Sequence, residues 1–243
     1  MKVTVIIPAR YGSSRLPGKP LINILDKPMI HHVYENCKKS SYVNRVIVAT
    51  DDQRIKDTVE SFGGECFLTS VSHQTGTDRI AEVAEQISSD IILNVQGDEP
   101  LLKSTHIDEL IKPLLKNEKI SMATLKTRIN SHGDIHNVNI VKVITNKNNE
   151  AIYFSRSPIP YNRENNPNVS YYKHVGIYAY RKKYLLNYKN LKESMLEDVE
   201  ILEQLRAIEN GDKIYIAEIF DTLHGVDVEE DIKVVENKMR AQI

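Results

Sequence analysis

The stretch "VTVIIPARYGSSRLPGKPL", residues 3–21, decides the fold. Its first part, Val3 to Pro8, is a near-continuous apolar run that is typical of a buried strand, and a loop broken by glycine and proline follows. Three further strands are predicted at 45–51, 65–70 and 90–98, and helices lie between them at 27–39, 51–64 and 77–87. This alternation predicts an α/β fold, with a Rossmann-like, mostly parallel sheet that is flanked by helices and binds ligands at the carboxyl ends of its strands.

The second half of the chain predicts a smaller mixed α/β subdomain. Strands at 138–146 and 151–160 flank the polar turn "NKNNE" as in a hairpin, and a long helix at 195–211 ends at Gly211. The remaining elements are strands at 171–181 and 213–220 and a closing helix at 228–239. We expect a single domain over residues 1–243, with a region inserted at about 130–195.

Composition narrows the function. The 243 residues carry a formal net charge of −1, so general binding of nucleic acid is not expected. The two cysteines have no metal-binding spacing and are expected to be buried thiols. The chain opens on a strand, and it contains no apolar run long enough to span a membrane. We therefore expect a cytoplasmic protein without membrane insertion.

Three cations lie in the loop after the first strand: Arg10, Arg15 and Lys19. Guanidinium and ammonium groups beside a glycine-rich turn can bind phosphate oxygens. The loop matches neither the Walker A spacing nor the G-x-G-x-x-G turn, so it predicts phosphate binding of another kind. The alternative is a solvated charged loop, and the position after the first parallel strand argues against it.

A carboxylate follows the fourth predicted strand. In "NVQGDEPL", Asp98 lies where a buried strand ends, and this position suits a ligand of Mg²⁺ beside a triphosphate, with Glu99 as a weaker candidate. No arrangement for nucleophilic catalysis is evident in the sequence. Alignment of reactants and neutralisation of charge are therefore the expected catalytic means.

Several motifs resemble those of the sugar-activating cytidylyltransferases, and most of all the CMP-Kdo synthetases (Kdo is 3-deoxy-manno-octulosonate). These are "IPARYGSSRLPGKPL", "VATDD", "GTDRIAEV", "NVQGDEPL", "YFSRSPIPY", "KHVGIYAYR", "LEQLRAIENG" and "GVDVEED", in the order of that family. The resemblance implies a nucleotidyltransferase fold and Mg²⁺-dependent transfer of CMP from CTP to the anomeric 2-hydroxyl of Kdo. Pyrophosphate would be released, and the CMP-Kdo formed would serve lipopolysaccharide biosynthesis.

The resemblance also implies site residues. Arg10, Arg15, Lys19 and Asp98 would be catalytic, and Asp98 and Asp227 would hold Mg²⁺. The nucleotide would contact Pro8, Ala9, Arg10, Arg15, Lys19, Gly76, Thr77, Arg79, Gln96 and Asp98. The sugar would contact Gln96, Arg156, Arg163, His174, Tyr178, Glu203 and Gln204. The inserted region would bind the sugar and form a homodimer.

Structural alternatives accompany these roles. Asp227 could cap the last helix with Glu230 completing a capping box, and Thr77 could cap the helix at 77–87 with Arg79 solvated. Arg156 could anchor a strand end, Arg163 could be a loop cation, and His174 and Tyr178 could be structural. Without the resemblance, Glu200, Glu203 and Gln204 would be a solvated stripe on the long helix.

Two positions depart from the CMP-Kdo synthetase pattern. Asp78 and Asp198 stand where many members have Glu and His or Gln. An added carboxylate near the far end of the sugar would favour an ammonium group, so 8-amino-3,8-dideoxy-manno-octulosonate is an alternative acceptor. A sialate-activating enzyme and a catalytically inactive nucleotide-binding regulator are further alternatives.

Overall fold

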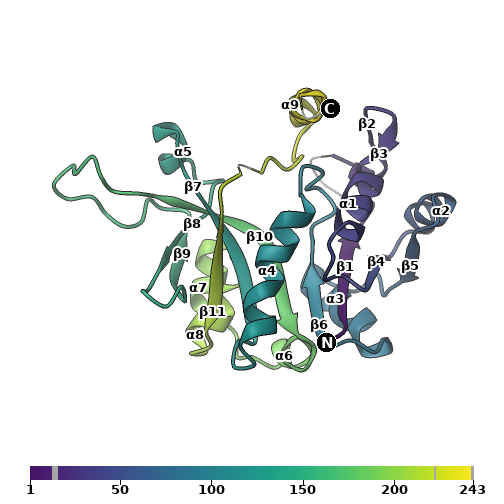
Figure 1. Cartoon of the computed structure of the whole chain (residues 1–243), viewed down its shortest axis with the longest axis horizontal. Helices are drawn as coiled ribbons and strands as arrows, with labels where there is room; N and C mark the ends of the chain where they lie inside the picture. Colours follow the sequence, from purple (N-terminus) through teal and green to yellow (C-terminus); the bar gives the residue numbers. More distant parts are fainter. Residues whose placement is uncertain (13–15, 222, 242–243) are drawn as a thin grey trace. The chain divides into compact units, whose positions relative to one another are not determined.

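The structure, a computed structural model, describes residues 1–12, 16–221 and 223–241 (Figure 1). The chain divides into two compact units, the first comprising Met1–Asp108 with Leu223–Ile243 and the second Glu109–Thr222. The second unit includes the region at about 130–195 that the resemblance assigns to sugar binding and dimer formation, and those roles stay predictions.

The first unit is built on four parallel strands in the order β6-β1-β4-β5. Their bounds are β1 Val3–Ala9, β4 Arg45–Thr50, β5 Glu65–Leu68 and β6 Ile91–Asn94. The central strands β1 and β4 are buried along almost their whole length, as their apolar sequences predict. The α/β fold with a parallel sheet is therefore confirmed.

The strand order places a ligand-binding position beside β1. The chain passes from β1 to β4 and β5 on one side and then returns to β6 on the other side, so its direction reverses at β1. In such sheets a crevice forms at this reversal, outside the carboxyl ends of the strands. Helices α1 Met29–Lys38, α2 Gln53–Ser61 and α3 Gly76–Gln86 connect the strands.

The end of the chain returns to the first unit. Helix α9, Glu229–Arg240, lies next to the short hairpin of β2 Asn23–Ile24 and β3 Lys27–Pro28. The Glu236 carboxylate accepts a hydrogen bond from Leu25 N at 2.9 Å. This return brings the segment before α9 to the first unit, although it is distant in sequence.

The second unit contains a mixed sheet. Strand β7, Met122–Arg128, pairs parallel with β11, Ile214–Ile219, and antiparallel with β10, Tyr172–Arg181. The hairpin of β8 Lys142–Thr145 and β9 Ala151–Ser155 confirms the predicted antiparallel pair. Sequence patterns did not predict β7 or the helix α4, Ser104–Lys116. The unit also contains the short helices α5 His132–His136 and α6 Lys182–Tyr188.

The predicted long helix at 195–211 is wrong. The segment 195–211 instead forms two short helices, α7 Met195–Glu200 and α8 Leu205–Glu209. Ile201 lies between them and has a left-handed backbone with φ 53°. The apolar spacing runs across this break, so periodicity alone did not reveal it. Val199, which belongs to this apolar spacing and would face inward in a continuous helix, is exposed. Among the described residues, no helix is long and apolar enough to cross a membrane.

The left-handed backbone at Ile201 leads to a prediction about the stability of the protein. A β-branched residue is strained at positive φ, and Ile201 is 73% exposed, so little packing is lost when its side chain is removed. We expect Ile201→Gly to raise the free energy of unfolding by about 1 kcal/mol in chemical denaturation. The control Val199→Gly removes an equally exposed side chain from within α7 and should lower stability. A lower free energy of unfolding in Ile201→Gly would contradict a left-handed backbone at position 201.

Candidate active site

A cavity of about 290 Å³ lies in the first unit, where β1 and the residues after β6 end. Its lining comes from five parts of the chain: the end of β1, the 3-10 helix at Lys19–Leu21, the start of α3 with the residues before it, the segment of Asp98 and the segment of Asp227. The lining residues are Pro8, Ala9, Arg10, Lys19, Pro20, His73, Gln74, Thr75, Gly76, Arg79, Gln96, Gly97, Asp98 and Asp227. The cavity occupies the crevice that the strand order predicts.

Lys19 lies at the centre of the charged side of this cavity. Its Nζ donates to Asp98 Oδ2 at 2.6 Å and to Asp227 Oδ1 at 3.3 Å. Its backbone is positioned by Gly18, whose φ of 68° suits glycine and whose N–H donates to Tyr11 O at 2.9 Å. A Cβ on Gly18 would lie 3.1 Å from the Tyr11 ring, so the turn also needs glycine for space.

Two contacts bring Asp227 to Asp98. Val226 N donates to the carbonyl of Asp98 at 2.9 Å, and a Cβ on Gly225 would lie only 3.3 Å from that same carbonyl. Close approach of the two backbones therefore favours glycine at position 225.

The Asp231 carboxylate fixes the segment from the other side. It accepts hydrogen bonds from Asp227 N at 2.8 Å and from Val228 N at 3.0 Å. The N-cap of α9 is Val228, and Asp231 supplies the capping carboxylate. The alternative in which Asp227 caps the helix with Glu230 is therefore wrong, and the Asp227 side chain faces Lys19 instead.

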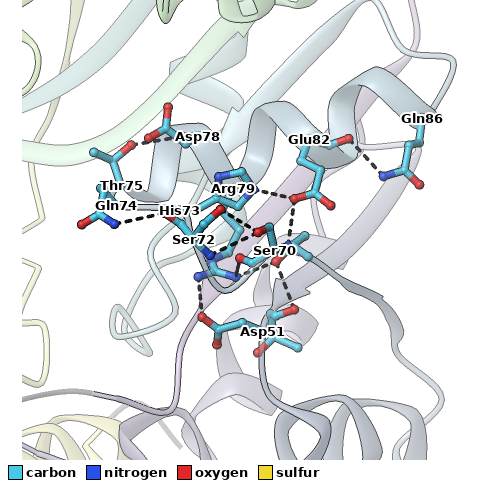
Figure 2. A network of polar contacts seen from close by, with 12 residues as sticks. Asp51, Ser70, Ser72, His73, Gln74, Thr75, Asp78, Arg79, Glu82 and Gln86 are labelled. Carbon is cyan, nitrogen blue, oxygen red and sulfur yellow. Dashed lines mark hydrogen bonds and ion pairs between the residues drawn. The ribbon is translucent and has the colours of Figure 1, made fainter.

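The start of α3 forms another wall of the cavity, and Figure 2 shows the polar contacts around it. Thr75 caps the helix, because its hydroxyl oxygen accepts a hydrogen bond from Asp78 N at 3.1 Å. The prediction that Thr77 is the cap is wrong, and Thr77 is buried inside the first turn. Gly76 packs on Pro8, since a Cβ there would lie 3.3 Å from the proline ring. The helix start therefore lies directly against the end of β1.

Arg79 is buried rather than solvated. It is 4% exposed, and its guanidinium donates to Asp51 at 2.6 Å and to the Thr69 hydroxyl (Figure 2). Its charge is thus neutralised within this wall. The solvated alternative is wrong, and any contact of Arg79 with a ligand would be made by a guanidinium that Asp51 already holds.

His73 lies in the same wall as Arg79. Its Nε2 lies 2.5 Å from the Glu82 carboxylate, which also accepts a hydrogen bond from Ser70 N at 3.0 Å (Figure 2). Burial alone would raise the pKa of Glu82, but the bonds from Ser70 and His73 lower it overall. The imidazole is therefore held by a carboxylate that stays ionised.

Most of the residues predicted to bind the nucleotide line this one cavity. They are Pro8, Ala9, Arg10, Lys19, Gly76, Arg79, Gln96 and Asp98, with Asp227 beside them. Thr77 lies one residue further along α3, and Arg15 lies outside the described residues. Pro20 and Gly97 were not predicted. His73, Gln74 and Thr75 were expected only as part of the segment "HQTGTDR", residues 73–79, which the family resemblance places at the nucleotide.

In the second unit, His174 is enclosed. It is 8% exposed, its Nε2 lies 3.0 Å from the Thr124 hydroxyl, and its ring packs edge-on against Phe154. Burial, together with the charge of Lys173, lowers the pKa of His174 to about 3. Tyr178 packs against the same imidazole at 5.5 Å between ring centroids. Burial and the nearby Glu203 carboxylate raise the pKa of Tyr178. Both side chains are uncharged at neutral pH.

Arg156 and Arg163 differ in their surroundings. The Arg156 guanidinium donates to the carbonyls of Glu200, Ile201 and Val138, which supports the alternative that it anchors the end of β9. The Arg163 side chain is 87% exposed and lies 3.7 Å from the Glu164 carboxylate. It stays a predicted sugar contact.

Gln204 in the second unit has a buried amide group that could bind a ligand. It is 4% exposed, and its amide Nε2 is buried without a hydrogen-bond partner within the part of the chain that the structure describes. Such a donor is costly unless a ligand or water accepts from it. Neither Gln204 nor Glu200 belongs to a solvated stripe, because the Glu200 carboxylate accepts hydrogen bonds from the Ser155 hydroxyl and from Arg156 N.

The carboxylates of Asp98 and Asp227 could supply part of the coordination shell of a hard divalent cation. In residues 1–12, 16–221 and 223–241, no group of three or more His, Cys, Asp or Glu side chains forms a complete metal site. Asp98 and Asp227 nevertheless share one small cation, the Lys19 ammonium. Mg²⁺ commonly takes one or two carboxylates and completes its shell with phosphate oxygens and water. The pair therefore suits Mg²⁺ that arrives with a phosphate ligand.

A parallel sheet that reverses its strand order beside a cavity lined by Arg10, Lys19 and Arg79 and by two carboxylates defines an enzyme of the nucleotidyltransferase class. The chain belongs to the cytidylyltransferase family, because the family model described as "Cytidylyltransferase" matches residues 4–214.

Relatives of known name agree with this family. The chain is 49% identical over 254 residues to the 3-deoxy-manno-octulosonate cytidylyltransferase of Geobacter metallireducens, covering 100% of both chains. It is also 49% identical to the protein of that name from Thermodesulfovibrio yellowstonii, covering 97% of both. A solved structure of CMP:2-keto-3-deoxy-manno-octonic acid synthetase complexed with CTP has a TM-score of 0.96 and 44% identity, with 100% of both chains covered.

The low pKa of His174 makes a pH prediction. Its folded pKa is about 3 against an ordinary value of 6.5, so between these values the unfolded chain binds a proton that the folded chain does not. The free energy of unfolding should therefore fall as pH falls from 6.5 towards 3, by up to ~1.4 kcal/mol per pH unit from this residue. His174→Gln should remove that part of the slope in denaturation curves between pH 4 and 6. The control is His132→Gln at an exposed position. An unchanged slope in His174→Gln would mean that His174 protonates in the folded protein.

Proposed function

We propose that this enzyme transfers CMP from CTP to the anomeric 2-hydroxyl of 3-deoxy-manno-octulosonate (Kdo), releasing pyrophosphate and forming CMP-Kdo. The observation that carries the proposal is the convergence of Lys19, Asp98 and Asp227 in one cavity. The names of the full-length relatives support Kdo as acceptor, and the neighbour solved with CTP supports CTP as donor.

In this proposal the cavity binds the triphosphate and the residues of α3 bind the nucleoside. Arg10 and Lys19 supply cations for the phosphate oxygens, as charge-assisted hydrogen bonds favour. The start of α3 adds backbone N–H groups near Gly76 and the positive end of an eleven-residue helix. The chain contributes orientation and charge neutralisation, and no covalent enzyme intermediate is invoked.

Asp98 and Asp227 would hold Mg²⁺ in the loaded enzyme. When bound, the ion would neutralise phosphate charge and favour ionisation of the sugar hydroxyl. Asp98 is fixed for this role through its carbonyl, which accepts from Val226 N, and Asp227 through Asp231. The two carboxylates are thus oriented by the fold before any ligand binds.

The second unit offers the acceptor groups that suit a polyhydroxylated acid. The unpaired Gln204 amide and the neutral His174 and Tyr178 can exchange hydrogen bonds with hydroxyl groups. Three N–H groups of Arg156 already bond to carbonyls, so only its two remaining N–H groups are available for the acceptor carboxylate. Arg163, Glu203 and Gln96 are proposed as further sugar contacts.

A substrate panel tests the function. The wild-type protein with Mg²⁺ should release pyrophosphate with CTP and Kdo, and much less with UTP or ATP, or with a sialate as acceptor. Parallel reactions with 8-amino-3,8-dideoxy-manno-octulosonate decide whether the exposed Asp198 and the first-turn Asp78 mark an amino-sugar enzyme. The control Asp98→Asn should keep its fold but lose activity by a factor of about 100 or more. CTP binding without turnover on any of these acids would refute the proposal and support a regulator.

We also propose that the enzyme works as a homodimer in the cytoplasm, with its product feeding lipopolysaccharide biosynthesis. The strands of the second unit are the proposed interface, and Ile152 on β9 is an apolar side chain that is 52% exposed there. Sedimentation should show a dimer for the wild-type protein and a shift towards monomer for Ile152→Glu. Val71→Glu, at an 80% exposed apolar residue of the first unit, is the control and should stay dimeric. A monomeric wild-type protein would contradict the proposal.

A further inference from the structure

Lys19 is bound to both carboxylates that are proposed to hold the divalent cation. Its Nζ lies 2.6 Å from Asp98 and 3.3 Å from Asp227. The Lys19 side chain is only 15% exposed, whereas those of Asp98 and Asp227 are 33% and 57% exposed. The ammonium is therefore the enclosed member of the cluster, and it takes the place where one small cation can contact both aspartates.

The backbone around Lys19 holds this arrangement. Lys19 N donates to Leu16 O, Ile22 N donates to Lys19 O, and Pro20 is buried beside them. The carbonyl of Asp98 is held by Val226 N. The backbone therefore fixes the positions of the aspartates. The Lys19 side chain is the part that can change conformation, because its ammonium group is attached through a flexible chain of four carbons.

We propose that Lys19 is a counter-ion that keeps the divalent site closed until a nucleotide triphosphate binds. This inference rests on the proposed function and concerns the regulation of the same site. A divalent cation that enters between Asp98 and Asp227 meets the repulsion of the ammonium at short range. A triphosphate supplies several anionic oxygens on the same side of the cavity, so Lys19 gains a new partner and releases the carboxylates. The nucleotide and the metal therefore bind cooperatively, and the free enzyme binds metal weakly.

Metal binding to the nucleotide-free protein is the direct test. Mn²⁺, used as a spectroscopic substitute for Mg²⁺, is titrated into the full-length protein and followed by electron paramagnetic resonance, with calorimetry for Mg²⁺. Lys19→Met removes the charge and keeps an unbranched side chain that is one atom shorter. It should bind Mn²⁺ at least tenfold more tightly than the wild-type protein in the absence of nucleotide, although it should bind CTP more weakly.

Arg10→Met is the matched control. Arg10 lines the same cavity and is exposed, and its loss changes the net charge equally. It should change nucleotide-free Mn²⁺ affinity by no more than about twofold. In the double variant Lys19→Met with Asp98→Asn the gain should disappear, because one of the two carboxylates is gone. Circular dichroism verifies that each variant is folded, and Lys19→Gln replaces Lys19→Met if the latter is not.

The outcomes separate this inference from the proposed function. Equal or weaker Mn²⁺ binding by folded Lys19→Met, or an equal gain in Arg10→Met, would overturn the role of Lys19 even if the wild-type enzyme makes CMP-Kdo. Wild-type Mn²⁺ affinity that is the same with and without CTP would also overturn it. If the wild-type protein fails in the substrate panel but Lys19→Met still shows the tenfold gain in Mn²⁺ affinity, the proposed acceptor chemistry is refuted and the counter-ion role stays in place.

Discussion

The ammonium group of Lys19 joins Asp98 and Asp227, which are 79 and 208 positions away from it along the chain. Each partner reaches the cavity for a separate reason: Lys19 follows the first strand, Asp98 follows the strand to which the chain returns, and Asp227 precedes the helix that ends the described chain. Three segments that share no local sequence feature are thus brought to one edge of a parallel sheet. The rest of the site, including the α3 wall and its buried ion pair, is arranged around this meeting point.

Contacts of the backbone determine where the carboxylates of Asp98 and Asp227 lie. The hydrogen bond from Val226 N to Asp98 O and the close approach at Gly225 set the distance between the aspartates, and Asp231 orients the turn that carries Asp227. Like charges held this close repel, so a cation is required to make the arrangement favourable. In the structure that cation is the Lys19 ammonium, and we propose that a metal and a triphosphate take its place during catalysis.

The sheet and the place of the cavity could be predicted from the sequence, because buried parallel strands read as apolar runs and their ends mark the ligand edge. The place of Asp98 at this edge could be predicted because Asp98 directly follows such an apolar run. The break at Ile201 could not be predicted, since apolar residues recur at helical spacing on both sides of it. Sequence order also could not distinguish Thr75 from Thr77 as the helix cap, because both precede the apolar face of α3 and only backbone geometry selects one. The role of Asp231 depends on contacts that no local pattern encodes.

A crystal structure of the enzyme with CTP and Mg²⁺ bound tests the central claim most directly. The account predicts that the triphosphate lies against Arg10 and Lys19, that the Lys19 ammonium has left the two carboxylates, and that the metal contacts both Asp98 and Asp227. A nucleotide bound elsewhere, or a metal that contacts neither aspartate while Lys19 remains between them, would contradict it.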